Sequence, residues 1–226
     1  IALAIAAFGW YARYGVRDHV WARNFAEVTP GEVYRSGRLT PTAMNRVVER
    51  HGIRTVIDLG AFHPGSLEER RAQRTADALG VTRYRLDLEG DATGNPNEYA
   101  HALRLIADPA NHPVLVHCSA GSERTGCLVA LYRVQTEDLS IDVSIDDLMA
   151  DANRHRDTRQ PDLRGMLLTW GDRVLDAVET GDDVRGIEPT APPVPVTRPE
   201  GRLPTDPEFD ADSPYKHEVP TPADES

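Results

Sequence analysis

Short strand-like segments alternate with longer amphipathic stretches along the middle of the chain. Residues 53–60, 83–88 and 114–116 are rich in apolar positions and are bounded by turn residues, as strands are. Apolar positions at helical spacing predict helices at 40–52, 66–80, 97–108, 127–136 and 162–178, with another that starts near residue 144. Strands that alternate with helices favour an α/β fold with a central, largely parallel sheet of about four to five strands flanked by helices.

Local signals mark several element boundaries. Two capping boxes, Ser66 with Glu69 and Ser144 with Asp147, predict helix N-termini. A Pro-Gly turn at residues 30–31 separates two short apolar runs, and it predicts a small hairpin that leads into the domain.

The first 23 residues have a different character. Residues 1–12 are uncharged and include Trp10 and Tyr11, and arginines follow them. A membrane span needs about 20 apolar residues, so we interpret 1–23 as the truncated end of a transmembrane anchor, with the domain on the cytoplasmic side. A secretory signal remnant or an amphipathic helix packed on the domain would also explain this composition.

The other end of the chain is acidic and rich in proline. Residues 182–226 hold eleven acidic and four basic residues, so they carry most of the net charge of −11. Low hydrophobicity and little periodicity predict a disordered tail, and a proline-rich ligand for a partner domain is a less favoured alternative. The chain thus divides into 1–23, a domain at 24–181 and a tail at 182–226. The acidic balance argues against nucleic acid as a partner.

The segment after residue 116 is the strongest candidate for chemistry. A strand that ends in a tight loop and continues into a helix points backbone N–H groups into one concavity, which binds anions. The positive helix end and the nearby arginine favour the nucleophilic thiolate of Cys118, and Arg124 can grip two phosphate oxygens. Thr125 can hydrogen-bond the Cys118 sulfur and help it leave. The predicted phosphate-binding residues are Ser119, Ala120, Gly121, Ser122, Glu123 and Arg124. A buried structural cysteine beside an arginine in a surface ion pair is the simpler alternative.

The full pattern His-Cys-x-x-Gly-x-x-Arg-Thr-Gly resembles the signature loop of the cysteine-dependent protein tyrosine and dual-specificity phosphatase superfamily. The segment Asn-Phe…Val-x-x-Gly-x-x-Tyr-Arg-Ser-Gly at residues 24–37 resembles the start of bacterial tyrosine phosphatases and of an atypical plant and fungal dual-specificity branch. The resemblance implies phosphomonoester hydrolysis through a phosphocysteine, with no metal or organic cofactor. A rhodanese-like sulfurtransferase also uses a cysteine loop after a strand, but the Arg-Thr-Gly that follows argues against it.

The resemblance also implies an aspartate general acid from a loop about 30 residues before the cysteine. The candidates are Asp87, Glu89 and Asp91. Asp87 lies in a predicted strand, where an ion pair with a neighbouring arginine is the simpler role. Asp91 follows a glycine in a loop, so we choose Asp91 as the acid.

Substrate preference follows from the loop composition. Phosphoinositide-directed members of the superfamily often carry a lysine within the loop, where this chain has Ser122 and Glu123. We therefore expect a phosphotyrosine-containing protein as substrate, with phosphoinositides or inositol phosphates as the alternative. A membrane-tethered module that binds phosphate without turnover is the alternative outside enzymes.

Other polar residues near the loop have more than one interpretation. Arg35 and Ser36 could line the mouth of the site, or Arg35 could pair with Asp58 and brace the fold. His117 fits a residue that holds the loop from behind. Two cysteines make no metal or disulfide pattern, so Cys127 is most simply a small apolar helix residue, with a protective disulfide to Cys118 as a minor alternative.

Overall fold

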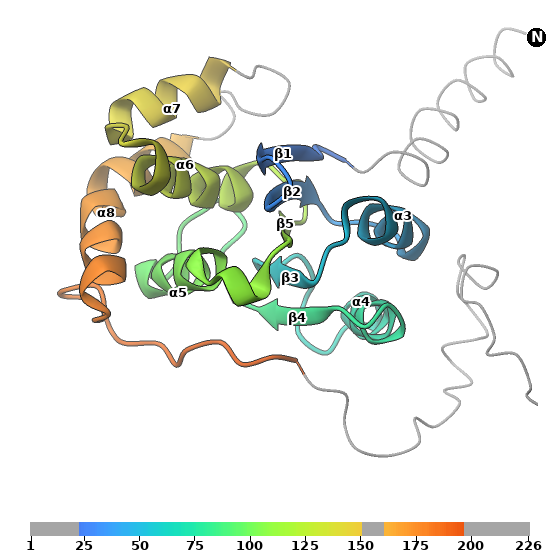
Figure 1. Cartoon of the computed structure of the whole chain (residues 1–226). Helices are drawn as coiled ribbons and strands as arrows, with labels where there is room; N and C mark the ends of the chain where they lie inside the picture. Colours follow the sequence, from blue (N-terminus) through green and yellow to red (C-terminus); the bar gives the residue numbers. More distant parts are fainter. Residues whose placement is uncertain (1–22, 151–160, 197–226) are drawn as a thin grey trace, which may run out of the picture.

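A central five-stranded sheet organises the computed structural model, which describes residues 23–150 and 161–196 (Figure 1). The strand order is β1-β2-β5-β3-β4, and only β1 runs antiparallel to its neighbour. The strands are β1 (Ala26–Thr29), β2 (Val33–Gly37), β3 (Thr55–Asp58), β4 (Thr82–Arg85) and β5 (Val114–Cys118). The predicted α/β fold with a largely parallel sheet is confirmed, and the predicted hairpin is β1 and β2.

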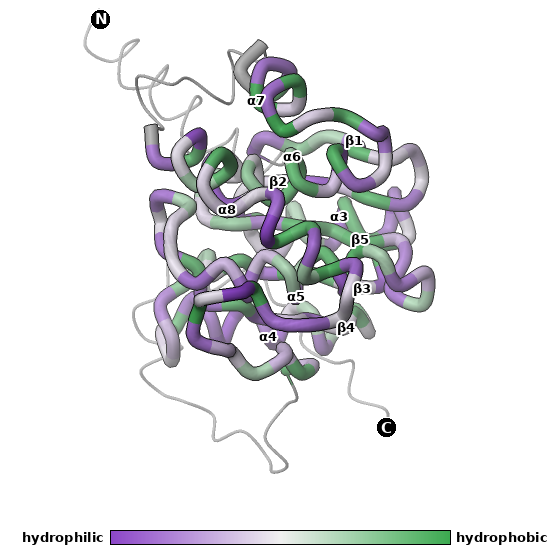
Figure 2. Tube along the Cα trace, turned by 90° about the vertical axis from the view of Figure 1, so that its left-hand side faces the viewer, coloured by the Kyte–Doolittle hydropathy of each residue, from purple (hydrophilic) through white to green (hydrophobic). Residues whose placement is uncertain are grey.

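Helices cover both faces of the sheet. Figure 1 shows α3 and α4 on one face, and α5, α6 and α8 on the other, with α7 beyond α6. Their bounds are α3 (Pro41–His51), α4 (Leu67–Ala78), α5 (Pro96–Ala107), α6 (Glu123–Glu137), α7 (Ile141–Ala150) and α8 (Pro161–Thr180), and a 3-10 turn, η2 (Pro109–Asn111), precedes β5. The larger core lies on the α5 and α6 face, and a smaller one lies under α3 and α4. Figure 2 shows the hydrophobic β5 inside the domain.

One of the two predicted capping boxes begins a helix as expected. The Ser66 Oγ accepts the backbone N–H of Glu69 at 3.2 Å and caps α4. The Glu69 carboxylate accepts the N–H of Gly65 at 2.6 Å, one residue before the position that the box predicts.

The second predicted box, at Ser144 and Asp147, is not where the helix starts. Helix α7 begins at Ile141, and the Ser140 Oγ accepts the backbone N–H of Val143 at 3.3 Å. Ser144 is buried, and its hydroxyl donates to the carbonyl of Ala130 in α6 at 2.9 Å. Packing against α6 therefore decides the role of Ser144, and Ser140 supplies the cap.

Residues 182–196, the start of the segment predicted to be disordered, lie along the domain. The N–H of Val184 donates to Asn97 Oδ1 at 2.6 Å, and the N–H of Val196 donates to the carbonyl of Arg83 at 2.8 Å. Val184 is buried. A side-chain acceptor on α5 and a backbone acceptor on β4 thus order this stretch despite its composition. The rest of the predicted tail, 197–226, lies outside the described residues, and the three-part division of the chain stays a prediction.

The prediction of a membrane-anchored protein with its catalytic domain on the cytoplasmic side is contradicted. Within residues 23–150 and 161–196, no helix combines the length and the apolar character that crossing a membrane requires. The apolar segment that suggested the anchor lies in residues 1–22, outside the described part of the chain.

Candidate active site

The loop from Cys118 to Arg124 packs tightly against the end of β2. Gly121 has φ +69°, and a Cβ on it would lie 2.4 Å from the backbone nitrogen of Gly37. A Cβ on Gly37 would lie 2.9 Å from the backbone of Ala120. Only glycine fits at these two positions, so the close approach of the two backbones sets the shape of the loop.

Three successive carbonyls of this loop are bound from outside. The backbone N–H of Arg38 donates to the carbonyl of Ser119 at 3.2 Å, and Asn24 Nδ2 donates to that of Ala120 at 2.8 Å. Arg35 Nη2 donates to the carbonyl of Gly121 at 2.6 Å. Because C=O and N–H point in opposite directions across a trans peptide, these contacts turn the following N–H groups toward the inside of the loop.

The Cys118 sulfur lies on that inner side. Its Sγ accepts the backbone N–H of Gly121 at 3.2 Å, and the residue is 2% exposed. The sulfur also lies at the end of β5 just before α6 begins, where the positive end of the helix favours an anion. The arrangement therefore stabilises a thiolate and provides N–H donors for an oxyanion beside it.

Arg124 is held rigidly from the neighbouring strands. Its Nη1 donates to the carbonyl of Leu59 at 2.8 Å, to that of Leu88 at 3.2 Å and to that of Gly60. Its Nε is buried and has no hydrogen-bond partner within the described ranges. A buried donor without a partner is costly unless a ligand satisfies it, so this guanidinium is prepared to bind an anion.

Thr125 does not make the expected contact. It is fully buried, and its hydroxyl has no hydrogen-bond partner among the residues that the structure describes. The sulfur of Cys118 takes its hydrogen bond from Gly121 instead. A role for Thr125 in the departure of the sulfur stays a prediction.

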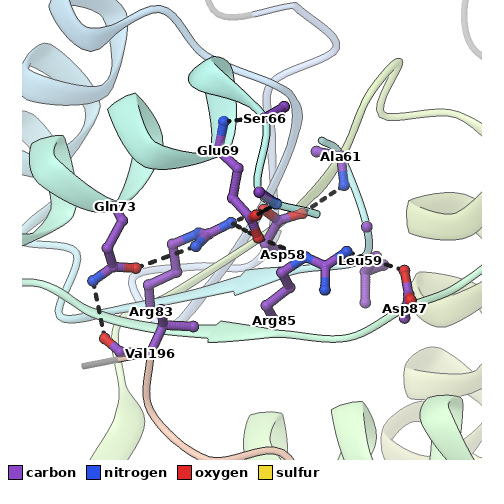
Figure 3. Close-up of polar contacts among 12 residues, drawn as sticks. Asp58, Leu59, Ala61, Ser66, Glu69, Gln73, Arg83, Arg85, Asp87 and Val196 are labelled. Atoms are coloured by element: carbon purple, nitrogen blue, oxygen red, sulfur yellow. Dashed lines mark hydrogen bonds and ion pairs between the residues drawn. The ribbon is translucent and has the colours of Figure 1, made fainter. Parts of the chain in front are cut away.

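A buried polar network joins β3, β4 and α4 beside the strand that ends in Cys118 (Figure 3). Arg83 Nη2 donates to Asp58 Oδ2 at 2.6 Å, and the N–H of Ala61 donates to Asp58 Oδ1 at 2.7 Å. Burial alone would raise the pKa of Asp58, but His117, Arg83 and the Ala61 hydrogen bond bring it below its ordinary value. Burial lowers the pKa of His117, so the neutral imidazole fits a structural role behind the loop. The side chain of Arg35 donates to the loop carbonyl of Gly121 and so braces the loop. Asp58 pairs with Arg83, so the alternative ion pair between Arg35 and Asp58 does not form.

The structure places the three acid candidates differently. Asp87 is exposed and pairs with Arg85 at 3.1 Å, the role that the sequence favoured, although β4 ends at Arg85 and Asp87 lies beyond the strand. Glu89 is exposed. Asp91 is exposed in the loop before α5, and its Oδ1 accepts the N–H and the hydroxyl of Thr93 at 3.0 and 2.6 Å. These bonds lower the pKa of Asp91, and the charge of Arg124 also lowers it. Asp91 thus lies in the field of the phosphate loop.

Tyr99 is a residue of the site that the sequence analysis missed. It is completely buried in α5, and its hydroxyl donates to the carbonyl of Ala92 at 2.8 Å. It also lies against Cys127 in α6, whose pKa burial raises to about 12. Tyr99 therefore ties the loop of Asp91 to the helix that begins at the phosphate loop. Its position in the sequence gave no signal beyond a place in a predicted helix.

Residues 17–163 match the PTP-NADK family, described as a DSP-PTPase phosphatase fused to NAD+ kinase. The inositol diphosphatase SIW14 of Saccharomyces cerevisiae is 30% identical over 117 residues, which cover 49% of this chain and 39% of that protein. The inositol diphosphatase DSP1 of Oryza sativa subsp. japonica is 36% identical over 115 residues, 49% of each chain. The chain thus spans less than half the length of these two curated relatives.

Solved structures show the same fold. The crystal structure of P. aeruginosa TpbA superposes with a TM-score of 0.57 at 18% identity, and the match covers 70% of this chain and 91% of that one. The catalytic core of SIW14 with citrate gives a TM-score of 0.56 at 21% identity, over 71% of this chain and 93% of that one. The family match covers more than half of the chain and includes the whole loop from Cys118 to Arg124. The chain therefore belongs to the DSP-PTPase phosphatases, within the cysteine-dependent dual-specificity and tyrosine phosphatase superfamily.

Proposed function

We propose that this chain hydrolyses phosphomonoesters through a phosphocysteine at Cys118, with phosphotyrosine in proteins as the preferred substrate. One observation carries the proposal: a buried sulfur accepts an inward N–H of its own loop, next to a buried arginine that keeps a free donor. This geometry combines a nucleophile with an anion site, which phosphoryl transfer requires.

The first step is attack of the Cys118 thiolate on phosphorus. The loop N–H groups and Arg124 hold the equatorial oxygens, and their hydrogen bonds strengthen as negative charge builds up there. Asp91 donates a proton to the leaving oxygen as the P–O bond breaks. In the second step Asp91, now ionised, takes a proton from water, which attacks the phosphocysteine and releases the sulfur with help from Thr125.

The charge around the mouth favours a singly phosphorylated substrate. Glu123 lies in the loop next to Arg124, and burial raises its pKa, as do the nearby charges of Asp91 and Asp162. The carboxylates of Glu123 and of the residues that act on it repel a substrate that brings further phosphates. An aromatic phosphomonoester brings none.

Inositol phosphates are the second candidate because the curated relatives are inositol diphosphatases. The discriminating experiment measures phosphate release by the full chain from a phosphotyrosine peptide, a phosphothreonine peptide and a diphosphorylated inositol phosphate. Higher kcat/KM on the phosphotyrosine peptide supports the first proposal, and a preference for the inositol substrate replaces it with the second. Enzyme denatured rapidly with detergent at neutral pH during turnover should carry covalent phosphate. Phosphopeptide binding without any release would instead indicate a binding module.

Replacing Asp91 by Asn should lower kcat on a phosphotyrosine peptide about 100-fold. The loss should be much smaller on p-nitrophenyl phosphate, since nitrophenolate leaves without a proton. The low pKa of Asp91 means that only the acidic range protonates it well, so wild-type kcat on the peptide should fall as the pH rises. Asp87→Asn and Glu89→Gln are the matched variants. If either of them shows the leaving-group-dependent loss and Asp91→Asn does not, the acid is that residue.

Replacing Glu123 by Lys should shift the preference toward multiply phosphorylated substrates. The change removes one carboxylate beside Arg124 and adds a cation. We expect the ratio of kcat/KM for the inositol substrate to that for the phosphotyrosine peptide to rise about 10-fold at low ionic strength, with a smaller change at high salt. Glu49→Lys, on the exposed side of α3 across the sheet from α6, is the charge-matched control. An equal shift in both variants would assign the effect to net charge alone.

A further inference from the structure

A cavity of about 320 Å³ lies between α3 and α4, over the sheet. The helix α4 faces it with residues at i, i+3, i+4, i+7 and i+8, which form one side of a helix. These residues are Glu68, Arg71, Ala72, Thr75 and Ala76. Val56 and Val81 form part of its floor, and Met44 of α3 lies in the opposite wall.

The cavity has an apolar interior and a basic mouth. Leu39, Met44 and Phe62 line it and are only half-buried, so the two helices leave apolar surface uncovered there. Arg23, Arg38 and Arg71 also line it, against a single acid, Glu68. Three arginines against one acid make the opening of the cavity positively charged, although the whole chain has a net charge of −11.

Arg83 adds a buried polar group to the wall. Its guanidinium pairs with Asp58, but its Nε is buried without a hydrogen-bond partner in the parts of the chain that the structure describes. The residue is 2% exposed. A buried donor of this kind calls for an acceptor, which an anionic head group could supply.

We propose that this cavity binds a small amphiphilic anion, with a carboxylate or phosphate monoester head on an apolar chain or ring. The volume is at the lower end of small-molecule sites. The apolar interior takes the chain or ring, and the arginine forks pair with the oxygens of the head.

The cavity is separate from the phosphate loop. His117 is in its wall, whereas the next residue in β5, Cys118, packs with the core on the α5 and α6 face. Successive strand residues point to opposite faces, so a ligand in the cavity lies behind the strand that ends in the nucleophile. An oxyanion at Cys118 should therefore leave it in place.

The test measures the binding of anilinonaphthalene sulfonate to the full chain by fluorescence. This probe has an aromatic body and one anionic head. Ala72→Phe fills the cavity from α4, and Arg71→Glu reverses a charge at its mouth; each should weaken binding at least about 10-fold, or 1.4 kcal/mol. Arg50→Glu, on the exposed side of α3, is the charge-matched control and should bind like the wild type.

Competition identifies the head group and the place. Decanoate or decyl phosphate should displace the probe, whereas decanol and orthovanadate should not. Wild-type affinity in both Ala72→Phe and Arg71→Glu would overturn the proposal, since the probe would then bind elsewhere. Displacement by orthovanadate would show that the probe binds in the phosphate loop. Displacement by decanol, at the concentration at which decanoate displaces the probe, would show that the site does not require an anionic head group. Either result rejects the site as proposed.

Discussion

Replacing Cys118 by Ser should lower kcat by about 10⁴-fold or more on every phosphomonoester substrate. A serine hydroxyl is not ionised at neutral pH, so it is a much weaker nucleophile than the thiolate that it replaces. The loop N–H groups and Arg124 are untouched, so the variant should still bind a phosphotyrosine peptide. The measurement is steady-state phosphate release together with peptide binding by calorimetry.

Cys127→Ser is the matched control, because it makes the same atomic change at a buried cysteine in α6, outside the phosphate loop. Cys127 is completely buried, and a pKa of about 12 leaves its thiol protonated at neutral pH. Tyr99 lies beside it, and its oxygen can accept a hydrogen bond from a serine hydroxyl while its own proton stays bonded to the carbonyl of Ala92. We expect turnover within about 3-fold of the wild type. A comparable loss in both variants would mean that serine damages the fold, and Cys118 would lose its assignment as nucleophile.

Sequence-local features of the site could be predicted well. The cysteine, the glycine and the arginine of the loop lie within seven consecutive residues, so their spacing predicts a strand, a turn and a following helix, although α6 begins at Glu123 and not at the predicted Cys127. The Ser66 cap is equally local. Such features depend on chain neighbours, and the fold adds little to them.

Contacts between distant segments could not be predicted because they depend on the strand order. The choice between Arg35 and Arg83 as the partner of Asp58 is an example. Strand β5 lies between β2 and β3, which separates Arg35 from Asp58, whereas β4 lies next to β3 and brings Arg83 close. The carbonyls of Leu59 and Leu88 that hold Arg124 follow from the same topology. Nothing in the composition indicates which charges meet.

Side-chain hydrogen bonds to distant backbone carbonyls explain the other two differences. Ser144 matches a capping pattern, but it is buried against α6, and its hydroxyl donates to the carbonyl of Ala130 instead of capping its own helix. Residues 182–196 lack periodicity, yet Asn95 and Asn97 both donate to the carbonyl of Glu188 and hold this segment on α5. Amide side chains satisfy an irregular backbone without any repeating pattern in the segment itself.

Replacing Asp58 by Asn should lower the free energy of unfolding by about 3 kcal/mol at pH 7. The change leaves the guanidinium of Arg83 buried without a full countercharge, since its other acid, Glu69, is 3.9 Å away. Desolvation makes such a charge expensive. Urea unfolding followed by circular dichroism measures the difference, and Asp87→Asn is the matched control. Asp87 also pairs with an arginine, but its side chain is 73% exposed, so its removal should cost about 0.5 kcal/mol or less.

The difference should also depend on pH, with a definite sign. The pKa of Asp58 is lowered in the folded protein from the value of 3.8 that we take for the unfolded chain. Its ionised form therefore stabilises the fold above pH 3.8, and this contribution is lost as the pH falls from there through the folded pKa. The gap between wild type and Asp58→Asn should stay constant from pH 7 to about pH 5 and shrink below pH 4. If Asp58→Asn lowers the free energy of unfolding at pH 7 no more than Asp87→Asn does, the attraction between Asp58 and Arg83 only offsets the cost of removing both charges from water. Hydrophobic packing, and not the ion pair of Asp58 with Arg83, would then be what holds β5 and Cys118 in position.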